Sequence, residues 1–435
     1  MAPKPVFCEG SPSWDPDTYL ADTELHARGS ALLANNDLRS AITTSFLLRK
    51  TDSYVYHAIV ATNLAQVQQV VSLGDAHGLH AWYFDDPSQP PTIERPADSN
   101  GDTSTPNPKP QPLPPPPKSD IEAYLSIFSP SNSAPTALRN FTSNAKKGSL
   151  RQRIGHHLTS KRYIHPSHTN TLNKLPRLKS KPAPHNPYLT YLSWAIINLE
   201  FAGPCPLSEH GPSRPPNSQL TLPILMHHFG CVCPSHEALE ILRLLADGRE
   251  IIDVGSGNGY WTRMLREYHD AFHKSKSKST TTVPPVTPVD SAQSAWRVSW
   301  VGDTIIADAA TYLGGARRGA RDAVLLMVYP IVGGGIAGGS EGGFTRGCLD
   351  AYEGDTVAVV GTQNANGYTG FRSMTMDQYM ERERGEWVKV VQVPLPSFPG
   401  KDEALFVFQR GERAPKGDES MYNYLPISHP SQDRH

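Results

Sequence analysis

Three glycines and a carboxylate stand close together near the middle of the chain, in the run Asp-Val-Gly-Ser-Gly-Asn-Gly at 253–259. The apolar residues 250–254 predict a short strand before this run, and residues 260–267 predict a helix after it. Ligands of doubly wound sheets lie at the carboxyl ends of the strands, and glycine lets the backbone approach them closely. The run therefore predicts a binding turn. The residues expected to contact the ligand are Asp253, Gly255, Ser256, Gly257 and Gly259.

Two further carboxylates end predicted strands later in the chain. Asp290 closes the run 286–290, and Asp303 closes the run 296–303, with Asp308 as the alternative to Asp303. Additional strands are predicted at 322–330, a continuous apolar run typical of a strand buried on both faces, and at 355–361, 386–393 and 404–410.

The spacing Asp-x-Gly-x-Gly-x-Gly resembles the first motif of the class I, seven-stranded, S-adenosylmethionine-dependent methyltransferases. A dinucleotide-binding fold would have its third glycine at 260, where this chain has Tyr260, so a nicotinamide oxidoreductase is disfavoured. The order of the predicted strands over 234–410 resembles the same family. The run Pro-Ser-x-Glu-Ala-Leu at 234–239 also resembles a segment of methyltransferase-like proteins of fungi and bacteria.

This resemblance implies an α/β fold with a doubly wound, mostly parallel, seven-stranded sheet whose last two strands are antiparallel to each other. It implies S-adenosyl-L-methionine as the cofactor, with Asp290 accepting hydrogen bonds from both ribose hydroxyls and Asp303 holding the adenine amino group. The activity would be methyl transfer to an unidentified small molecule or protein. The alternative is an inactive fold of this family that serves as a cofactor-binding or interaction module.

The acceptor side of the site is less defined, because methyl transfer depends mainly on positioning and needs no particular general base. Residues 328–331 read Val-Tyr-Pro-Ile where amino-methylating members of the family have Asn/Asp-Pro-Pro-aromatic, which argues against nucleobase-amine or glutamine methylation. No catalytic residue is assigned. The residues expected to face the acceptor are Tyr329, Gln363, Asn364 and Tyr368. No metal is expected, since Cys231 and Cys233 lack a second ligand pair at suitable spacing.

The 435 residues include 40 prolines and carry a formal charge of −1, which predicts a folded core interrupted by extended segments rather than a polyanion-binding protein. We expect an N-terminal helical region at 1–84, a disordered Pro-rich and basic linker at 85–186 and a helical lead-in at 187–233. A methyltransferase-like domain at 234–411 and a flexible tail at 412–435 would follow. The basic stretch 146–181 is either a solvated tether or a weak docking site for a polyanion or a protein.

Five scattered cysteines do not form a disulfide framework, and a reducing compartment suits them. The first residues lack a secretory signal, and no run approaches the ~18 apolar residues of a spanning helix. We therefore expect an intracellular protein of the cytoplasm, the nucleus or both, with no membrane partner.

Overall fold

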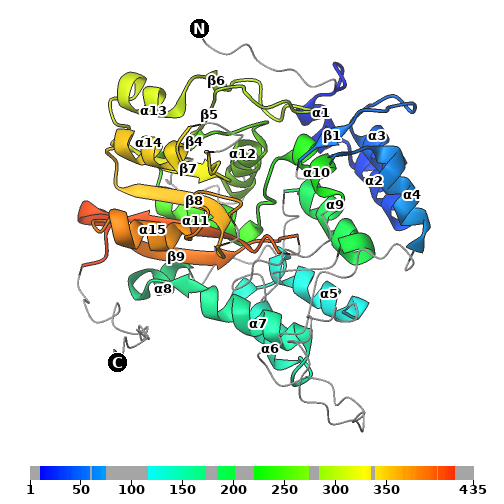
Figure 1. The fold of residues 1–435 in the computed structure, drawn as a ribbon, viewed down its shortest axis with the longest axis horizontal. Coiled ribbons are helices and arrows are strands. Elements are labelled where there is room, and N and C mark those ends of the chain that lie inside the picture. The colour runs from blue at the N-terminus through cyan, green and yellow to red at the C-terminus, as the bar shows by residue number, and fades with distance from the viewer. Residues whose placement is uncertain are drawn as a thin grey trace, which may run out of the picture.

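A single β-sheet forms the centre of the computed structural model, which describes residues 10–58, 61–74, 116–172, 184–200, 220–273, 284–334, 339–365, 367–398 and 400–416. The strand order is β3-β9-β10-β8-β7-β4-β5-β6 (Figure 1). The strands are β3 (Tyr163–Ile164), β4 (Glu250–Val254), β5 (Val286–Asp290), β6 (Ile305–Ile306), β7 (Ala323–Val328), β8 (Thr356–Thr362), β9 (Val388–Pro394) and β10 (Glu403–Gln409).

Most of this sheet is parallel. The pairs β4·β5, β4·β7, β5·β6 and β7·β8 are parallel, whereas β10 lies antiparallel between β8 and β9. The expected mostly parallel α/β sheet and its closing antiparallel pair are therefore present. The sheet has eight strands instead of the expected seven, because β3 pairs with β9 at one edge.

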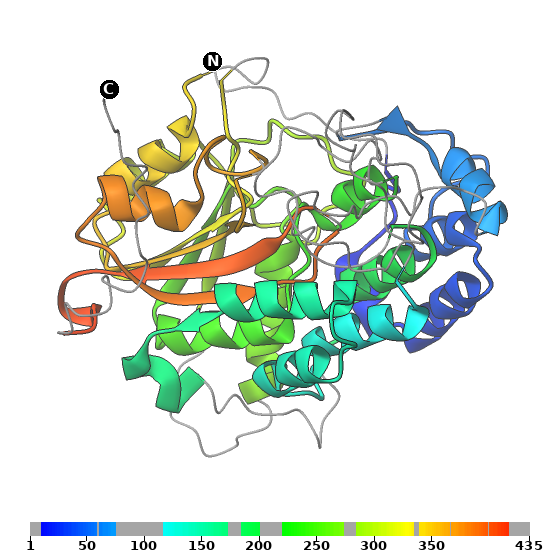
Figure 2. The ribbon, with the colours of Figure 1, turned by 60° about the horizontal axis from the view of Figure 1, so that its bottom comes forward.

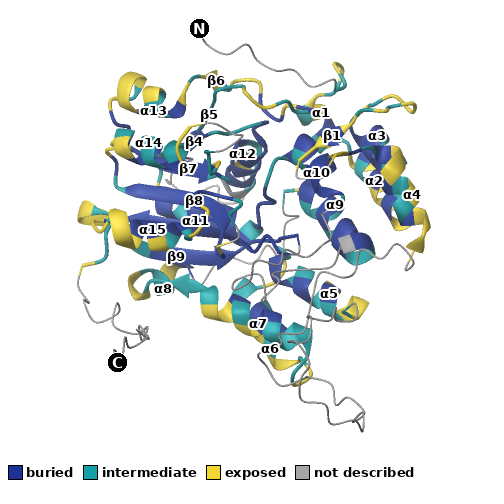
Figure 3. Ribbon diagram, viewed as in Figure 1, coloured by how far each residue is buried: buried dark blue, intermediate teal, exposed yellow. Residues whose placement is uncertain are grey.

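Alternate residues of the central strands pack into two cores, one on each face of the sheet. Ile251 and Leu326 belong to the first core, and their neighbours Ile252 and Leu325 belong to the second. Figure 3 shows these strands as buried along their length. Helices α11 (His236–Ala246) and α12 (Tyr260–His273) cover the first face. The second face is covered by α13 (Ala309–Thr311), η5 (Tyr312–Ala316), α14 (Gly343–Ala351) and α15 (Met376–Glu383).

The N-terminal helices share the first core with the sheet instead of forming a separate unit. Tyr191 donates a hydrogen bond to the Ala41 carbonyl (3.0 Å), and the Tyr56 hydroxyl lies 3.0 Å from Nε2 of His228. Figure 1 shows this layer at one side of the sheet. Its elements are α1 (Pro16–Ala21), α2 (Thr23–Ala34), α3 (Leu38–Ser45), β1 (Tyr56–His57), β2 (Ala61–Thr62), α4 (Leu64–Ser72), α9 (Pro187–Ala195), η3 (Ile196–Glu200) and α10 (Leu222–Phe229).

The expectation of a disordered linker over 85–186 is wrong for residues 116–172, which form helices and the edge strand β3. A few large apolar side chains are spaced so that each reaches the first core, among them Tyr124, Phe141 and Leu158. Tyr124 also accepts a hydrogen bond from the Ser397 amide (3.2 Å). Figure 2 shows this layer along the sheet. Its elements are α5 (Lys118–Leu125), η2 (Ser126–Phe128), α6 (Ala134–Ser143), α7 (Leu150–Lys161) and α8 (Pro166–Leu172).

The remaining parts of that expectation, at 85–115 and 173–183, lie outside the described residues, as does most of the expected tail beyond η7 (Gly411–Arg413). Within the basic stretch, Arg151 forms an ion pair with Asp120 (3.0 Å) and Arg162 with Glu237 (2.6 Å). Part of its positive charge is thus neutralised inside the fold. None of the described helices has the length and apolar character needed to cross a membrane.

Candidate functional site

The glycine turn follows β4 directly and is fixed to β5 by two hydrogen bonds. The amides of Gly255 and Ser256 both donate to the Val289 carbonyl, at 2.8 and 3.1 Å. Gly257 has φ +60°, a conformation that L side chains rarely adopt, and a Cβ there would lie 2.8 Å from Cζ2 of Trp296. The turn therefore requires glycine at 257 for its backbone and for its contact with the indole.

A cavity of about 450 Å³ opens beside this turn, at the carboxyl ends of β4, β5 and β7. This volume is typical of a site for a small ligand or cofactor, for which ~300–1,000 Å³ is usual. Three of the sequence-predicted residues from the turn line it: Gly255, Ser256 and Gly257. The Ser256 hydroxyl oxygen is buried and has no hydrogen-bond partner among the described residues, so it is available to a ligand.

Asp290, at the end of β5, lines the same cavity. One carboxylate oxygen accepts a hydrogen bond from the Gly257 amide (2.9 Å), and the other accepts from the Ala292 amide (2.6 Å). Each carboxylate oxygen has a second lone pair, so this orientation leaves acceptor capacity for a ligand. The structure thus brings Asp290 and the glycine turn together.

The structure does not place Asp303 in the cavity lining. The third strand is β6 at Ile305–Ile306, so Asp303 precedes that strand, and its exposed carboxylate pairs with Arg266 (2.8 Å). Asp308 follows β6 and lines the cavity, where it also accepts a hydrogen bond from the Thr311 amide (2.9 Å). Of the two candidates at this position, Asp308 lies in the cavity lining and Asp303 does not.

Asp253 and Gly259 support the turn from behind and are absent from the cavity lining. The buried Asp253 carboxylate accepts a hydrogen bond from the Thr262 hydroxyl (2.7 Å), which ties β4 to α12. Burial, with a further contribution from the negative charge of Asp290, raises the pKa of Asp253 to about 7. A Cβ at Gly259 would lie 2.2 Å from Cγ2 of Val301, so this glycine makes room for a loop.

Of the four residues expected to face an acceptor, Tyr329 lines the cavity, whereas Gln363, Asn364 and Tyr368 do not. Gln363 is buried; its side-chain amide donates to Asp402 (2.8 Å), and its carbonyl accepts from Gln392 (3.0 Å). The loop after β8 is therefore held toward the loop between β9 and β10 instead of the cavity.

Several aromatic residues of the site were not predicted from the sequence. Trp296, from the loop between β5 and β6, covers the glycine turn, and Phe344, at the start of α14, would lie 3.1 Å from a Cβ at Gly255. A single aromatic residue, in a loop or at the start of a helix, carries no periodic signal. Only the closed fold shows that they reach the same cavity.

The N-terminal layer borders the glycine turn through a second, wider hollow. This hollow measures about 1220 Å³, and its lining includes 10–13, 47–49 and 51–54 together with Gly257, Asp290 and Trp296. Asp52 forms an ion pair with the buried Arg297 guanidinium (2.6 Å), which lies 4.3 Å from the centre of the Tyr54 ring. The N-terminal layer is thus anchored next to the wall of the site.

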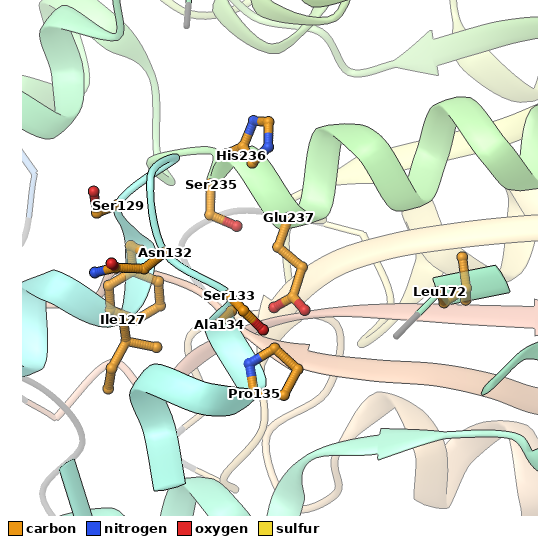
Figure 4. A pocket seen from close by; sticks show the side chains of 11 residues that line it. Ile127, Ser129, Asn132, Ser133, Ala134, Pro135, Leu172, Ser235, His236 and Glu237 are labelled. Carbon is orange, nitrogen blue, oxygen red and sulfur yellow. The ribbon is translucent and has the colours of Figure 1, made fainter. Parts of the chain in front are cut away.

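A smaller hollow lies between α6 and the start of α11, where Glu237 faces Pro135 (Figure 4). Its volume is about 30 Å³, which leaves space for roughly one water molecule. Both oxygens of Glu237 already accept hydrogen bonds from Arg162, at 2.6 and 2.9 Å. This hollow therefore offers no binding site for a larger ligand.

The described residues contain no group of three His, Cys, Asp or Glu side chains that could hold a metal ion. Cys231 lies in the cavity wall, and burial raises the pKa of its thiol to about 11. Cys231 is therefore a neutral thiol at physiological pH.

Comparison with known proteins adds distant likenesses. No protein-family model matches the chain, and no curated protein matches its sequence. A solved structure from Pyrococcus horikoshii, provisionally assigned as an RNA methyltransferase, is 12% identical in sequence, with a TM-score of 0.25. The match covers 41% of this chain and 81% of the other chain. An S-adenosylmethionine-dependent methyltransferase from Anabaena variabilis is 13% identical, and the match covers 38% of this chain and 77% of the other chain (TM-score 0.23). The trans-methyltransferase CalH, in complex with S-adenosylhomocysteine, is 9% identical, and the match covers 71% of this chain and 98% of the other chain (TM-score 0.25). These values assign no activity to the chain.

Proposed function

We propose that the chain is an S-adenosylmethionine-dependent methyltransferase. One observation carries this proposal: Asp290 and Asp308, at the ends of the neighbouring strands β5 and β6, line the same cavity as the glycine turn. Carboxylates at these two strand ends match the ribose and adenine positions that the family resemblance implies. The antiparallel β10, set between β8 and β9, is also as the resemblance implies.

The lining residues fit this cofactor chemically. The buried hydroxyl of Ser256 has no hydrogen-bond partner among the described residues. Gly255 and Gly257 have positive φ angles, which favour glycine, so neither position puts a side chain into the cavity. The charged side chains among the described lining residues are Asp290 and Asp308. Opposite charges attract strongly where little water is present, so this lining suits a ligand that carries a net positive charge, as S-adenosylmethionine does.

The cofactor supplies an electrophilic methyl group on a sulfonium when it is bound. The contribution of the chain is to hold the reacting atoms in line and to exclude water, which accounts for much of the catalysis in such a transfer. Asp290, fixed by the Gly257 and Ala292 amides, orients the ribose. Trp296 covers the turn, and Tyr329 borders the space left for the acceptor.

Calorimetry on the full chain tests this function directly. We expect S-adenosylmethionine and S-adenosylhomocysteine to bind and NAD not to bind. Binding of NAD with no binding of S-adenosylhomocysteine would refute the proposal. Binding of the methionine cofactor without transfer to any acceptor would favour the alternative, an inactive cofactor-binding fold whose fourth strand lacks the amino-methylating motif.

Asp290→Asn tests the ribose role separately. The substitution removes one acceptor and the charge, so affinity for S-adenosylhomocysteine should fall roughly ten- to hundredfold, since hydrogen bonds to charged groups contribute about 1.5–3 kcal/mol. Both carboxylate oxygens of Asp290 already accept hydrogen bonds from backbone amides. The NH2 group of an asparagine would face one of these N–H groups, so the substitution also disturbs the loop. A 2′,3′-dideoxy analogue of S-adenosylhomocysteine measures that second effect. It should bind the variant more weakly only by the effect of the disturbed loop, and thus by a smaller factor than S-adenosylhomocysteine does.

A further inference from the structure

The cavity has two chemically different ends. Both carboxylates of the described lining lie at the β5 and β6 end. Toward β7 the lining is apolar or aromatic, and we call this part the acceptor compartment. Its residues are Cys231, Val328, Tyr329, Pro330, Ile331 and Phe344.

Tyr329 is held firmly in this compartment. Its backbone has φ +54°, rare for a tyrosine, and its amide donates to the Val360 carbonyl (2.7 Å). The ammonium group of Lys401 lies 4.5 Å from the centre of the Tyr329 ring and donates a hydrogen bond to the Cys231 carbonyl (3.2 Å). Burial raises the pKa of Tyr329, so its phenol is neutral and not available as a base.

Lys401 brings no net charge to the compartment. It forms an ion pair with Glu403 at 2.8 Å, and both side chains are almost fully buried, at 1% and 2% exposure. Neither residue lines the cavity. An acceptor would therefore meet an aromatic wall backed by a compensated charge pair, instead of a free cation.

This lining discriminates between classes of acceptor. Moving a phosphate or carboxylate into an apolar space without a counter-charge is unfavourable by several kcal/mol, and Asp290 and Asp308 would repel it further. A neutral aromatic molecule instead gains roughly 25 cal/mol for each Å² of apolar surface removed from water. The described compartment residues also provide no carboxylate or imidazole that could act as a general base.

From these observations, and resting on the proposed methyltransferase function, we propose that the acceptor is a neutral aromatic small molecule that carries a phenolic hydroxyl. A phenol has a pKa of about 10, as in tyrosine, so it loses its proton far more readily than an aliphatic alcohol and depends less on a general base. The phenolic oxygen forms a bond to the methyl carbon, and the methyl–sulfur bond breaks with its electron pair left on sulfur. The phenolic proton passes to water.

The test uses 2-naphthol as the neutral aromatic probe and a decauridylate RNA as the anionic one. Each is added to the full-length protein saturated with S-adenosylhomocysteine, and binding is measured by calorimetry. Transfer of a radioactive methyl group from S-adenosylmethionine to each probe is measured in parallel. We expect 2-naphthol to bind and to be methylated, and the RNA to do neither.

A matched pair of variants locates the binding. Ile331 is 58% exposed at the compartment, and Leu73 is 55% exposed at the end of α4. Ile331→Asp should weaken 2-naphthol binding about fivefold or more, since it removes apolar contact and adds a charge. Leu73→Asp should leave it unchanged. Both variants should still bind S-adenosylhomocysteine, and Leu73→Asp should do so with wild-type affinity.

Three outcomes overturn the inference while the proposed function stands: S-adenosylhomocysteine binds but 2-naphthol does not, the RNA is methylated instead, or both variants behave alike toward 2-naphthol. If S-adenosylhomocysteine itself does not bind, the proposed function fails, and the inference fails with it.

Discussion

Replacing Gly257 by alanine tests whether the glycine turn is the cofactor site. A left-handed backbone costs a residue with a Cβ about 1–2 kcal/mol, and Gly257 has φ +60°. The new Cβ would also lie 2.8 Å from the Trp296 ring, which must retreat by about 0.6 Å to reach an ordinary contact of 3.4 Å. Gly257 and Trp296 both line the cavity, so the added methyl group and the shifted indole change its wall. Affinity for S-adenosylhomocysteine should therefore fall at least ~10-fold, or about 1.4 kcal/mol.

Gly411→Ala is the matched control for this substitution. Gly411 has φ +61° with no atom within 4 Å of an added Cβ. It follows β10, which is antiparallel to β8, so it lies near the amino end of β8, whereas the cavity lies at the carboxyl ends of the parallel strands. Both variants should lose about 1–2 kcal/mol of unfolding free energy in urea titrations from the backbone alone. Only Gly257→Ala should lose affinity by calorimetry. Equal affinities in the two variants would show that the ligand does not contact this turn.

Three further predictions concern carboxylates. Asp308→Asn should lower calorimetric affinity for S-adenosylhomocysteine several-fold, whereas Asp303→Asn should leave it unchanged; the reverse order would restore the assignment made from the sequence. Burial raises the pKa of Asp253 to about 7, so the folded state keeps a proton that the unfolded chain releases, and the unfolding free energy should decrease as pH rises from about 4 to 7. That decrease, measured by urea titration, should be smaller in Asp253→Asn. If the variant and the wild type lost stability equally over this pH range, the raised pKa of Asp253 would not be its cause. Asp52→Asn leaves the Arg297 guanidinium, 1% exposed, without its counter-charge and should cost about 3–5 kcal/mol of stability; adding Arg297→Met should recover part of the loss in thermal melts.

The central strands could be predicted because their sequences are continuous apolar runs. The predicted runs at 250–254 and 286–290 coincide with β4 and β5, and those at 322–330 and 355–361 overlap β7 and β8 closely. The third strand was misplaced because the residues around Trp300 alternate like a strand while making other contacts. The Trp300 amide donates to the Asn258 carbonyl (2.7 Å), and its indole donates to the His228 carbonyl.

Contacts between distant segments explain what the sequence did not reveal. The helices of 116–172 have too few apolar residues for strong periodicity, and they become stable only against partners such as Ser397. In the site, the Asp-x-Gly-x-Gly-x-Gly spacing and Asp290 could be read because they adjoin a strand. Trp296 comes from a loop and Phe344 from the first turn of α14, where neither periodicity nor spacing indicates a role. Gln363 follows a strand at the expected edge, yet its loop is held by Asp402.

The core that joins the N-terminal layer to the sheet has a consequence for synthesis. Asp52 leaves the ribosome 245 residues before its partner Arg297. At roughly 5–20 residues per second, the wait is on the order of 12–50 s. Phe46 is made 183 residues before Phe229, the later of its two aromatic partners on α10, so it lacks them for roughly 9–37 s at the same rate. The first helices therefore stay partly uncovered until α10 has been made, and during that time the nascent chain exposes apolar surface of the kind that chaperones bind.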